Sequence, residues 1–301
     1  MQPSLLRSLL FVPGNSEKML LKALQVHADA LVPDLEDSVP KEEKVAARNL
    51  VSKMLPSLRA QVHKRVQIIP RVNSFYTQWF EEDLKAVLQL GVSAVTIGKV
   101  ETAEEMKEIV KAIAEKEKEA NLPSNSIKLI PWLETAKGVA YAREICASGS
   151  RLAAIAFGAE DFTADMQIER TSSGKEFYHA RSWVCTAARA SKLPALDSPW
   201  PHFRDLQGLE EDCRVAKAMG YKGKFSIHPG NIDIINKQFS PSTKEVEFAK
   251  KIVEAFEVAR KAGRGSTSVN GTMVDEPVYR RARAVIEQES LLQDSSNASN
   301  L

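Results

Sequence analysis

Eight short apolar runs, separated by segments with helical periodicity, constrain the fold of this chain more than any other feature. The runs before Glu134 and Glu160 are especially rich in aliphatic residues, as is typical of buried strands. Strands and helices that alternate in this number predict a closed, parallel (β/α)8 barrel. An open doubly wound sheet is the alternative, but Gly14 after the first run lacks the glycine-rich turn of that fold. The runs comprise residues 9–13, 30–35, 66–72, 94–99, 128–133, 152–157, 193–196 and 224–227.

The segments between the runs place apolar residues on one face at helical spacing. Asn15 and Ser16 are the candidate caps of the first helix. Gly220 stands where the last of these helices should end. The predicted helices comprise residues 16–24, 101–120, 137–147, 176–191 and 209–219.

Helical patterns continue after the eighth run, where the barrel itself needs no further elements. Residues 241–262 predict a long helix, residues 263–272 a flexible glycine-rich loop, and residues from Pro277 to about 289 a basic helix. We therefore predict a catalytic barrel at residues 1–239, a helical extension or lid at 240–290 that packs on a neighbouring subunit, and a disordered polar tail at 291–301.

The composition argues against several classes of partner. With 41 basic and 39 acidic side chains the net charge is +2, which gives no reason to expect binding to nucleic acid or to an anionic membrane. Three widely spaced cysteines without a CxxC pair argue against a disulfide framework or a zinc site and fit a reducing compartment. No apolar stretch approaches the roughly 20 residues of a membrane span.

These features predict a cytoplasmic protein. The apolar start runs into Pro13 without a small-residue cleavage site, so we interpret it as the first strand and find no clear targeting segment. Mitochondrial and peroxisomal locations stay open, since Ser299-Asn300-Leu301 resembles a peroxisomal address without its basic centre.

Two carboxylates follow directly on apolar runs. The run 127–133 ends at Glu134, and the run 152–159 ends at Glu160-Asp161. Isolated charge at the mouth of a packed interior is unfavourable unless it is paired, hydrated or bound to a metal. We therefore predict that Glu134 and Asp161 bind a divalent cation, although both could instead cap the helices that follow them. Two carboxylates with water and substrate oxygens suit Mg²⁺ or Mn²⁺, whereas zinc would require histidine or cysteine.

Polar groups also follow the other runs, and in a (β/α)8 barrel these strand ends form the active site. Arg71 could hold a small carboxylate bidentately, or pair with the acidic residues after the second run. Lys99 could be a Schiff-base lysine, the other route to carbon–carbon cleavage in a barrel. The remaining strand-end groups are Asp34, Glu36, Asp37, Asn73, Asp197, His228 and Pro229.

Three further positions allow both a functional and a structural interpretation. Lys18 and Lys22 lie one turn apart on the first helix, where they could contact ligand phosphates or simply be solvated. The pair His228-Pro229 could form a structural turn. Asp275 follows the glycine-rich loop and could cap the next helix.

Seven motifs in order resemble the HpcH/HpaI aldolase superfamily, in particular its citrate-lyase beta-subunit-like branch, with citramalyl-CoA lyase and malyl-CoA lyase as close relatives. The similarity covers residues 8 to about 285. Each motif alone is a weak signal, but their common order makes the resemblance specific. The motifs are Leu10-Phe11-Val12-Pro13-Gly14-Asn15, Asp34-Leu35-Glu36-Asp37-Ser38-Val39, Arg71-Val72-Asn73, Pro131-Trp132-Leu133-Glu134-Thr135-Ala136, Phe157-Gly158-Ala159-Glu160-Asp161-Phe162, Ser226-Ile227-His228-Pro229 and Gly271-Thr272-Met273-Val274-Asp275.

The resemblance implies a Mg²⁺-dependent barrel, trimeric or hexameric, that cleaves or forms a β-hydroxyacyl-CoA such as citramalyl-CoA or malyl-CoA. The products would be acetyl-CoA and a 2-oxo acid such as pyruvate or glyoxylate. By motif position, Glu134 and Asp161 would bind the metal, and Arg71 would contact the substrate acid and the thioester oxygen. Asp275 would be the acid/base at the acetyl methyl carbon, contributed by the lid of a neighbouring subunit. The substrate and CoA path would include Phe11, Lys18, Lys22, Asp37, Arg71, Ile227, His228 and Pro229.

One departure from the family pattern is Phe11, where relatives often have tyrosine, so that a hydroxyl contact to the ligand would be missing. Three other functions stay open. A CoA-independent class II aldolase would use a 2-oxo acid and an aldehyde without binding CoA. A malyl-CoA-type thioesterase would form the enolate and then release free CoA by hydrolysis. A non-catalytic binding or scaffold protein would bind no Mg²⁺.

Overall fold

A computed structural model describes residues 5–149 and 151–297 and divides the chain into two compact units. The first unit is Met1–Asn236 and the second is Lys237–Leu301. The division falls three residues before the boundary that we predict at 239/240. Within the described ranges, no helix is long and apolar enough to cross a membrane.

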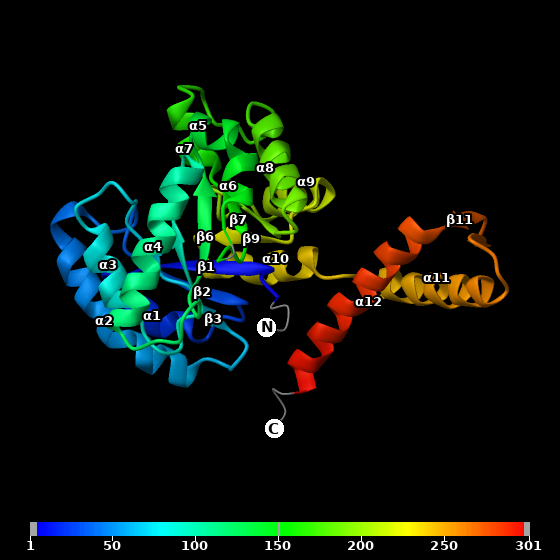
Figure 1. Cartoon of the computed structure of the whole chain (residues 1–301), viewed down its shortest axis with the longest axis horizontal. Helices are drawn as coiled ribbons and strands as arrows, with labels where there is room; N and C mark the ends of the chain where they lie inside the picture. Colours follow the sequence, from blue (N-terminus) through cyan, green and yellow to red (C-terminus); the bar gives the residue numbers. More distant parts are fainter. Residues whose placement is uncertain (1–4, 150, 298–301) are drawn as a thin grey trace. The chain divides into compact units, whose positions relative to one another are not determined.

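The first unit is built around a closed barrel of parallel strands (Figure 1). Strand β1 pairs with both β2 and β9, which closes the sheet and confirms the predicted barrel against the open alternative. The third strand position is divided into β3 and β4 around Pro70, and both pieces pair with β2. The strands are β1 Ser8–Pro13, β2 Ala30–Asp34, β3 Gln67–Ile68, β4 Arg71–Val72, β5 Ala94–Ile97, β6 Lys128–Leu133, β7 Ile155–Phe157, β8 Ala195–Asp197 and β9 Gly223–Ser226.

Side chains fill the inside of the barrel, so a ligand site can only lie at its mouth. Trp132 and Phe225 are the large members of this core, with ring centroids 4.3 Å apart. The indole N–H of Trp132 donates to Thr96 Oγ1 at 2.7 Å, which satisfies its only polar group. Small residues opposite these rings leave room for them, and Phe11 packs against the same cluster from β1.

Helices surround the strands (Figure 1). The cap predicted at Asn15 or Ser16 is Ser16, whose hydroxyl accepts from Met19 N–H. The helix predicted at 137–147 is divided at Tyr141 into two short helices. The helices and 3-10 turns are α1 Glu17–Ala23, η1 Lys41–Glu43, α2 Lys44–Gln61, α3 Phe80–Val87, α4 Ala103–Glu119, α5 Ala136–Ala140, α6 Ala142–Ala147, α7 Ala159–Asp165, α8 Tyr178–Ala190, α9 Leu206–Met219, η2 Pro229–Asn231 and α10 Ile232–Phe239.

Four charged side chains form a buried network in the barrel wall, here called the wall network: Arg181, Asp197, Asp212 and Lys224. Leu196 and Phe225 point into the barrel core, so their strand neighbours Asp197 and Lys224 point outward. Lys224 Nζ lies 2.5 Å from both Asp197 Oδ2 and Asp212 Oδ2. Arg181 contacts the same two carboxylates at 2.6 and 2.9 Å. Asp197 is therefore a structural residue of the wall and not one of the groups at the mouth.

The second unit corrects two predictions for the C-terminal extension. The loop predicted as flexible contains a β-hairpin, with Asn270 and Gly271 at positive φ in its turn. The last helix runs to Asn297, so the disordered tail predicted for residues 291–301 is wrong for 291–297, and 298–301 lie outside the described residues. The unit has an apolar core of its own, which joins its two long helices. Its elements are α11 Thr243–Lys261, β10 Thr267–Val269, β11 Thr272–Val274 and α12 Glu276–Asn297 (Figure 1).

Candidate active site

Seven charged side chains meet at the mouth of the barrel and are here called the mouth cluster: Asp34, Glu36, Asp37, Arg71, Lys99, Glu134 and Asp161. They come from the ends of β2, β4, β5 and β6 and from the first turn of α7. Parallel strands of a barrel all end at the same rim, and this geometry brings together residues up to 127 positions apart in the chain (34 to 161). The structure thus places Glu134, Asp161, Arg71 and Asp37 in one cluster, as predicted.

Asp34 holds Arg71 in a fixed orientation. The Nε and Nη2 atoms of Arg71 donate to the two carboxylate oxygens of Asp34 at 2.6 and 2.7 Å. Asp34 also accepts the backbone N–H groups of Glu36 and Ser38. Burial would raise the pKa of Asp34, but Arg71 outweighs it and holds this pKa below its ordinary value. The guanidinium lies 4.5 Å from the ring of Phe11.

The remaining edge of Arg71 faces the cluster. Its Nη1 atom donates to Asp37 Oδ2 at 2.9 Å and lies 3.4 Å from Glu36 Oε2. The side chain of Asp37 is 52% exposed and can turn away from this contact. The ion-pair interpretation of Arg71 is therefore correct for the ligand-free chain, and Nη1 is the atom that a substrate carboxylate could reach.

Glu134 lies in a narrow slot between two glycines. A Cβ atom at Gly98 would come within 2.6 Å of Glu134 Oε1, and one at Gly158 within 2.2 Å of Oε2. The backbone N–H of Lys99 donates to Oε1 at 2.8 Å. Burial and the repulsion from Asp161 raise the pKa of Glu134 to about 8. The fold thus holds a buried carboxylate that has no basic side chain within ion-pair distance among the described residues.

Lys99 adopts a backbone conformation that is uncommon for a residue with a side chain, with φ at +58°. Its Nζ donates to Glu36 Oε1 at 3.1 Å and lies 3.4 Å from Asp161 Oδ1. Burial would lower the pKa of Lys99, but Glu36 and Glu134 outweigh it and raise this pKa above its ordinary value. A Schiff-base lysine needs a lowered pKa, so the structure argues against that role.

Glu36 is a buried carboxylate of the mouth cluster whose hydrogen bonding is incomplete. The side chain is buried, and burial raises its pKa even though Arg71 opposes the shift. Within the described part of the chain, Glu36 Oε2 has no hydrogen-bond partner. Its ion-pair contact is Arg71 Nη1 at 3.4 Å, so this oxygen could accept a further partner such as a bound ion or water.

These features fit a hard divalent cation. Glu134 contacts the backbone N–H of Lys99, and Asp161 lies near the ammonium of the same residue. The side chain of Asp161 is 37% exposed and so open to solvent and ligands. No group of three or more His, Cys, Asp or Glu side chains with metal-binding geometry occurs among the described residues. Two protein carboxylates with several water or substrate oxygens are the usual donor set for Mg²⁺.

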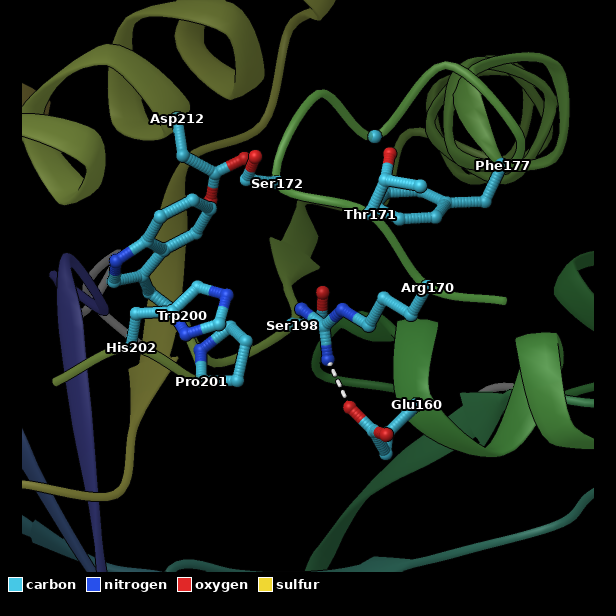
Figure 2. A pocket seen from close by; sticks show the side chains of 11 residues that line it. Glu160, Arg170, Thr171, Ser172, Phe177, Ser198, Trp200, Pro201, His202 and Asp212 are labelled. Atoms are coloured by element: carbon cyan, nitrogen blue, oxygen red, sulfur yellow. Dashed lines mark hydrogen bonds and ion pairs between the residues drawn. The ribbon is translucent and has the colours of Figure 1, made fainter.

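Beside the mouth cluster lies a cavity of about 150 Å³ at the ends of β7 and β8 (Figure 2). Arg170 and Glu160 form its floor on one side, joined by a 2.6 Å ion pair, and Trp200 and His202 face them. Glu160 therefore points away from its neighbour Asp161, which faces Lys99. The described residues that line the cavity are Glu160, Arg170, Thr171, Ser172, Gly174, Phe177, Ser198, Trp200, Pro201, His202 and Asp212, and do not include Arg71, Glu134 or Asp161.

The residues predicted for the CoA path lie on the surface. Lys18 and Lys22 are exposed on α1 and line a shallow hollow together with Glu17, Leu21 and Gln25. Ile227 is exposed, and His228 stacks on Phe203 with ring centroids 4.9 Å apart. The Nδ1 atom of His228 accepts the N–H of Gly230, so this histidine also shapes the turn after β9. The structure allows both interpretations of these residues.

Asp275 belongs to the second unit and precedes α12. Its Oδ1 accepts the backbone N–H of Val278 at 3.2 Å, which is the hydrogen bond of a helix cap. The structural interpretation of Asp275 is thus correct, and its catalytic role stays a prediction.

Sequence reasoning missed three parts of the site. The ion-pair role of Lys99 and the position of Glu36 depend on side-chain directions that no motif spacing reveals. The glycines Gly98 and Gly158 each follow a strand directly, where a small residue signals that another group approaches the backbone closely.

Comparisons with known proteins agree with this geometry. Residues 7–229 match the family HpcH/HpaI aldolase/citrate lyase, and the chain belongs to this family. It is 36% identical over 285 residues to citrate lyase subunit beta of Escherichia coli strain K12, which covers 95% of this chain and 93% of the relative. It is 32% identical over 290 residues to mitochondrial citramalyl-CoA lyase of Homo sapiens, which covers 93% of this chain and 84% of the relative.

The fold also matches solved structures. A structure of the protein CitE from Mycobacterium tuberculosis in complex with magnesium, acetoacetate and coenzyme A aligns with a TM-score of 0.74 and 29% identity. The alignment covers 93% of this chain and 97% of that chain. Family and fold together place this chain among the lyases with a (β/α)8 barrel.

Proposed function

We propose that this chain is a Mg²⁺-dependent carbon–carbon lyase that cleaves or forms a β-hydroxyacyl-CoA, with acetyl-CoA and a 2-oxo acid as the other reactants. The observation that carries the proposal is the pair Glu134 and Asp161 beside Arg71 at the mouth of the barrel. The relatives named as citrate lyase and citramalyl-CoA lyase, and the magnesium- and coenzyme A-bound relative, support the same reaction class.

Glu134 and Asp161 would hold the metal, and Mn²⁺ could replace Mg²⁺ in this donor set. When bound, the ion supplies Lewis-acid polarisation of the oxygens of the 2-oxo acid. Glu134 is fixed by its glycine slot and by the Lys99 N–H, so little reorganisation is needed to present its oxygens.

Arg71 would orient the acid and balance negative charge. Its Nη1 atom can exchange the exposed carboxylate of Asp37 for a carboxylate or thioester oxygen of the substrate, while Asp34 keeps the guanidinium in place. In the condensation direction, charge develops on the thioester oxygen as a proton leaves the acetyl methyl carbon. A fixed guanidinium at that oxygen lowers the barrier because it needs no rearrangement.

The surface beside the mouth offers a path for CoA. Lys18 and Lys22 are one helical turn apart on the exposed face of α1, where they can attract phosphate groups. Phe11, Ile227, His228 and Pro229 would complete the path to the reacting carbon. Phe11 packs under Arg71, so its main contribution would be to support the guanidinium.

Asp275 would move the proton at the acetyl methyl carbon, contributed by the second unit of a neighbouring subunit in a trimer or hexamer. The separate core of this unit is consistent with a body that can dock elsewhere. Loss of the acid/base in Asp275→Asn should cost ~10²–10⁴ in kcat, whereas loss of a helix cap alone would cost ~1 kcal/mol of stability and leave kcat nearly unchanged.

Subunit mixing tests the shared site. Asp275→Asn and Glu134→Ala proteins, each inactive alone, should regain partial activity after subunit exchange, because some sites then combine an intact Glu134 with an intact Asp275. Light scattering should show an oligomer. A monomer, or no recovery after verified exchange, would contradict the shared site without affecting the metal site.

A panel of thioesters tests the proposed reaction. Malyl-CoA, citramalyl-CoA and citryl-CoA should be assayed for acetyl-CoA with Mg²⁺, with EDTA, and after Mg²⁺ is restored. We expect metal-dependent acetyl-CoA formation from at least one of them. Free CoA without acetyl-CoA would show a thioesterase, and turnover of pyruvate with an aldehyde without CoA would show a class II aldolase. Acetyl-CoA formation that resists EDTA would contradict the proposal.

The compartment is a separate proposal. The human relative is named as mitochondrial, and we keep the cytoplasm as the expected location of this chain. Fractionation of cells that express the chain would test it, and recovery in the organelle fraction would contradict it.

A further inference from the structure

Lys99 contacts both residues to which we assign metal binding. Its backbone N–H donates to Glu134 Oε1 at 2.8 Å, and its Nζ lies 3.4 Å from Asp161 Oδ1. The same Nζ donates to Glu36 Oε1 at 3.1 Å and lies 3.7 Å from Asp37 Oδ1. A cation bound by Glu134 and Asp161 would therefore have to share Asp161 with this ammonium.

The mouth cluster has more carboxyl groups than cationic side chains, so the ammonium of Lys99 offsets negative charge when no metal ion is bound. Arg71 is committed to Asp34 and Asp37, which leaves Lys99 as the cation that lies nearest Asp161 and Glu36 Oε1. Lys44, the next basic group, donates to the backbone carbonyls of Leu35 and Glu36 and so serves the loop after β2. Without Lys99, several carboxylates at the mouth would repel one another in a partly desolvated place.

We propose that Lys99 is an internal counter-cation that stabilises the carboxylates of the metal-free cluster and competes with Mg²⁺ for them. The inference rests on the proposed function, because it requires that Glu134 and Asp161 bind the metal. The side chain of Lys99 is 35% exposed, so the ammonium can move toward solvent when a metal ion takes its place. The backbone N–H keeps its bond to Glu134 during this exchange, so that one ligand stays oriented while the other is released.

The variant Lys99→Met isolates the ammonium. Methionine is also unbranched, so the left-handed backbone and its N–H bond to Glu134 are kept at similar strain. Titration calorimetry with Mg²⁺ alone should show binding about tenfold tighter than in the wild type, because the competing charge is gone. The metal-free variant should melt at a lower temperature, since Asp161 loses its ion pair with Lys99 and Glu36 keeps only its ion pair with Arg71.

Lys137→Met is the matched control. It removes one positive charge from α5, three residues after Glu134 in sequence, and its ion-pair partner is Glu101 rather than a member of the mouth cluster. Mg²⁺ affinity should stay within about twofold of the wild type, because an exposed charge is screened by solvent and salt. Lys99→Gln serves as a second test variant if Lys99→Met does not fold.

Three results would overturn the inference. These are Mg²⁺ binding in the Lys99 variants that is unchanged, binding that is weaker than in the wild type, or equal tightening in Lys137→Met. A wild-type protein that binds no Mg²⁺, alone or with a 2-oxo acid, would overturn both this inference and the proposed function. A wild type that binds Mg²⁺ while the Lys99 variants bind it no more tightly would leave the proposed function standing.

Discussion

The barrel holds two groups of buried charges that differ in balance. The wall network contains two cations and two carboxylates, and each carboxylate contacts both Arg181 and Lys224. The mouth cluster contains five carboxylates with Arg71 and Lys99, and one of its buried oxygens has no hydrogen-bond partner in the described chain. The first group is balanced in charge, whereas the second holds three more carboxyl groups than cationic side chains.

The pKa values follow this difference. Burial would raise the pKa of Asp197, but Arg181 and Lys224 outweigh it and lower this pKa below its ordinary value. Burial and the repulsion from Asp161 together raise the pKa of Glu134 to about 8. A carboxyl group whose pKa is raised toward neutral pH at the mouth of an enzyme barrel indicates function, while the neutral network in the wall indicates stability.

The largest expected effect is the loss of activity when a metal ligand is removed. Glu134→Ala and Asp161→Ala should each lower the rate of acetyl-CoA formation by about 10⁴-fold or more, which corresponds to roughly 5 kcal/mol. Metal-free Glu134→Ala should melt at or above the wild-type temperature, because Glu134 is a buried carboxylate without an ion-pair partner among the described residues. Either variant with more than about a tenth of wild-type activity, under ~1.4 kcal/mol of barrier change, would show that the residue is not a metal ligand.

A substitution in the wall network should lower the stability of the fold and leave Mg²⁺ binding unchanged. Lys224→Met removes a fully buried ammonium and leaves Asp197 and Asp212 with Arg181 alone. The free energy of unfolding should fall by ~3–5 kcal/mol in urea titrations. Mg²⁺ affinity of the folded protein should stay within about twofold of the wild type. A variant as stable as the wild type would mean that the two groups do not differ as we describe.

The pH dependence of stability should separate the two groups with a smaller effect. Glu134 binds its proton more tightly in the folded metal-free chain than its ordinary pKa of 4.5 allows, so stability should fall as pH rises from about 4.5 to about 8. The lowered pKa of Asp197 has the opposite sign: its stabilisation is present above an ordinary pKa of 3.8 and is lost as pH falls through its folded value.

Urea titrations of metal-free protein at pH 6 and pH 8 would measure the contribution of Glu134. We expect a loss of roughly 1–2 kcal/mol at the higher pH. This loss should be much smaller in Glu134→Gln, which cannot ionise. Equal pH dependence in the two proteins would mean that Glu134 titrates normally.

The sequence predicts the parts of this picture that follow from periodicity and topology. All eight strand positions are predicted, and a parallel barrel then requires that Glu134, Asp161 and Arg71 meet at one rim. The strand-end position of Asp197 was misleading, because strand residues alternate and Leu196 takes the inward place. The ion pairs of Lys99 depend on a left-handed backbone at a non-glycine residue, which sequence does not reveal. The hairpin around Asn270-Gly271 is predictable from sequence, because this residue pair strongly favours a tight hairpin turn.

A Mg²⁺ titration of metal-free protein tests most directly whether the mouth cluster binds a divalent cation. Wild type, Glu134→Gln and Lys224→Met should be compared by calorimetry, each with and without pyruvate or glyoxylate. We predict one Mg²⁺ per chain in wild type and in Lys224→Met, tighter binding with the 2-oxo acid, and loss of binding in Glu134→Gln. Absence of Mg²⁺ binding in the wild type, or equal binding in Glu134→Gln, would contradict the account.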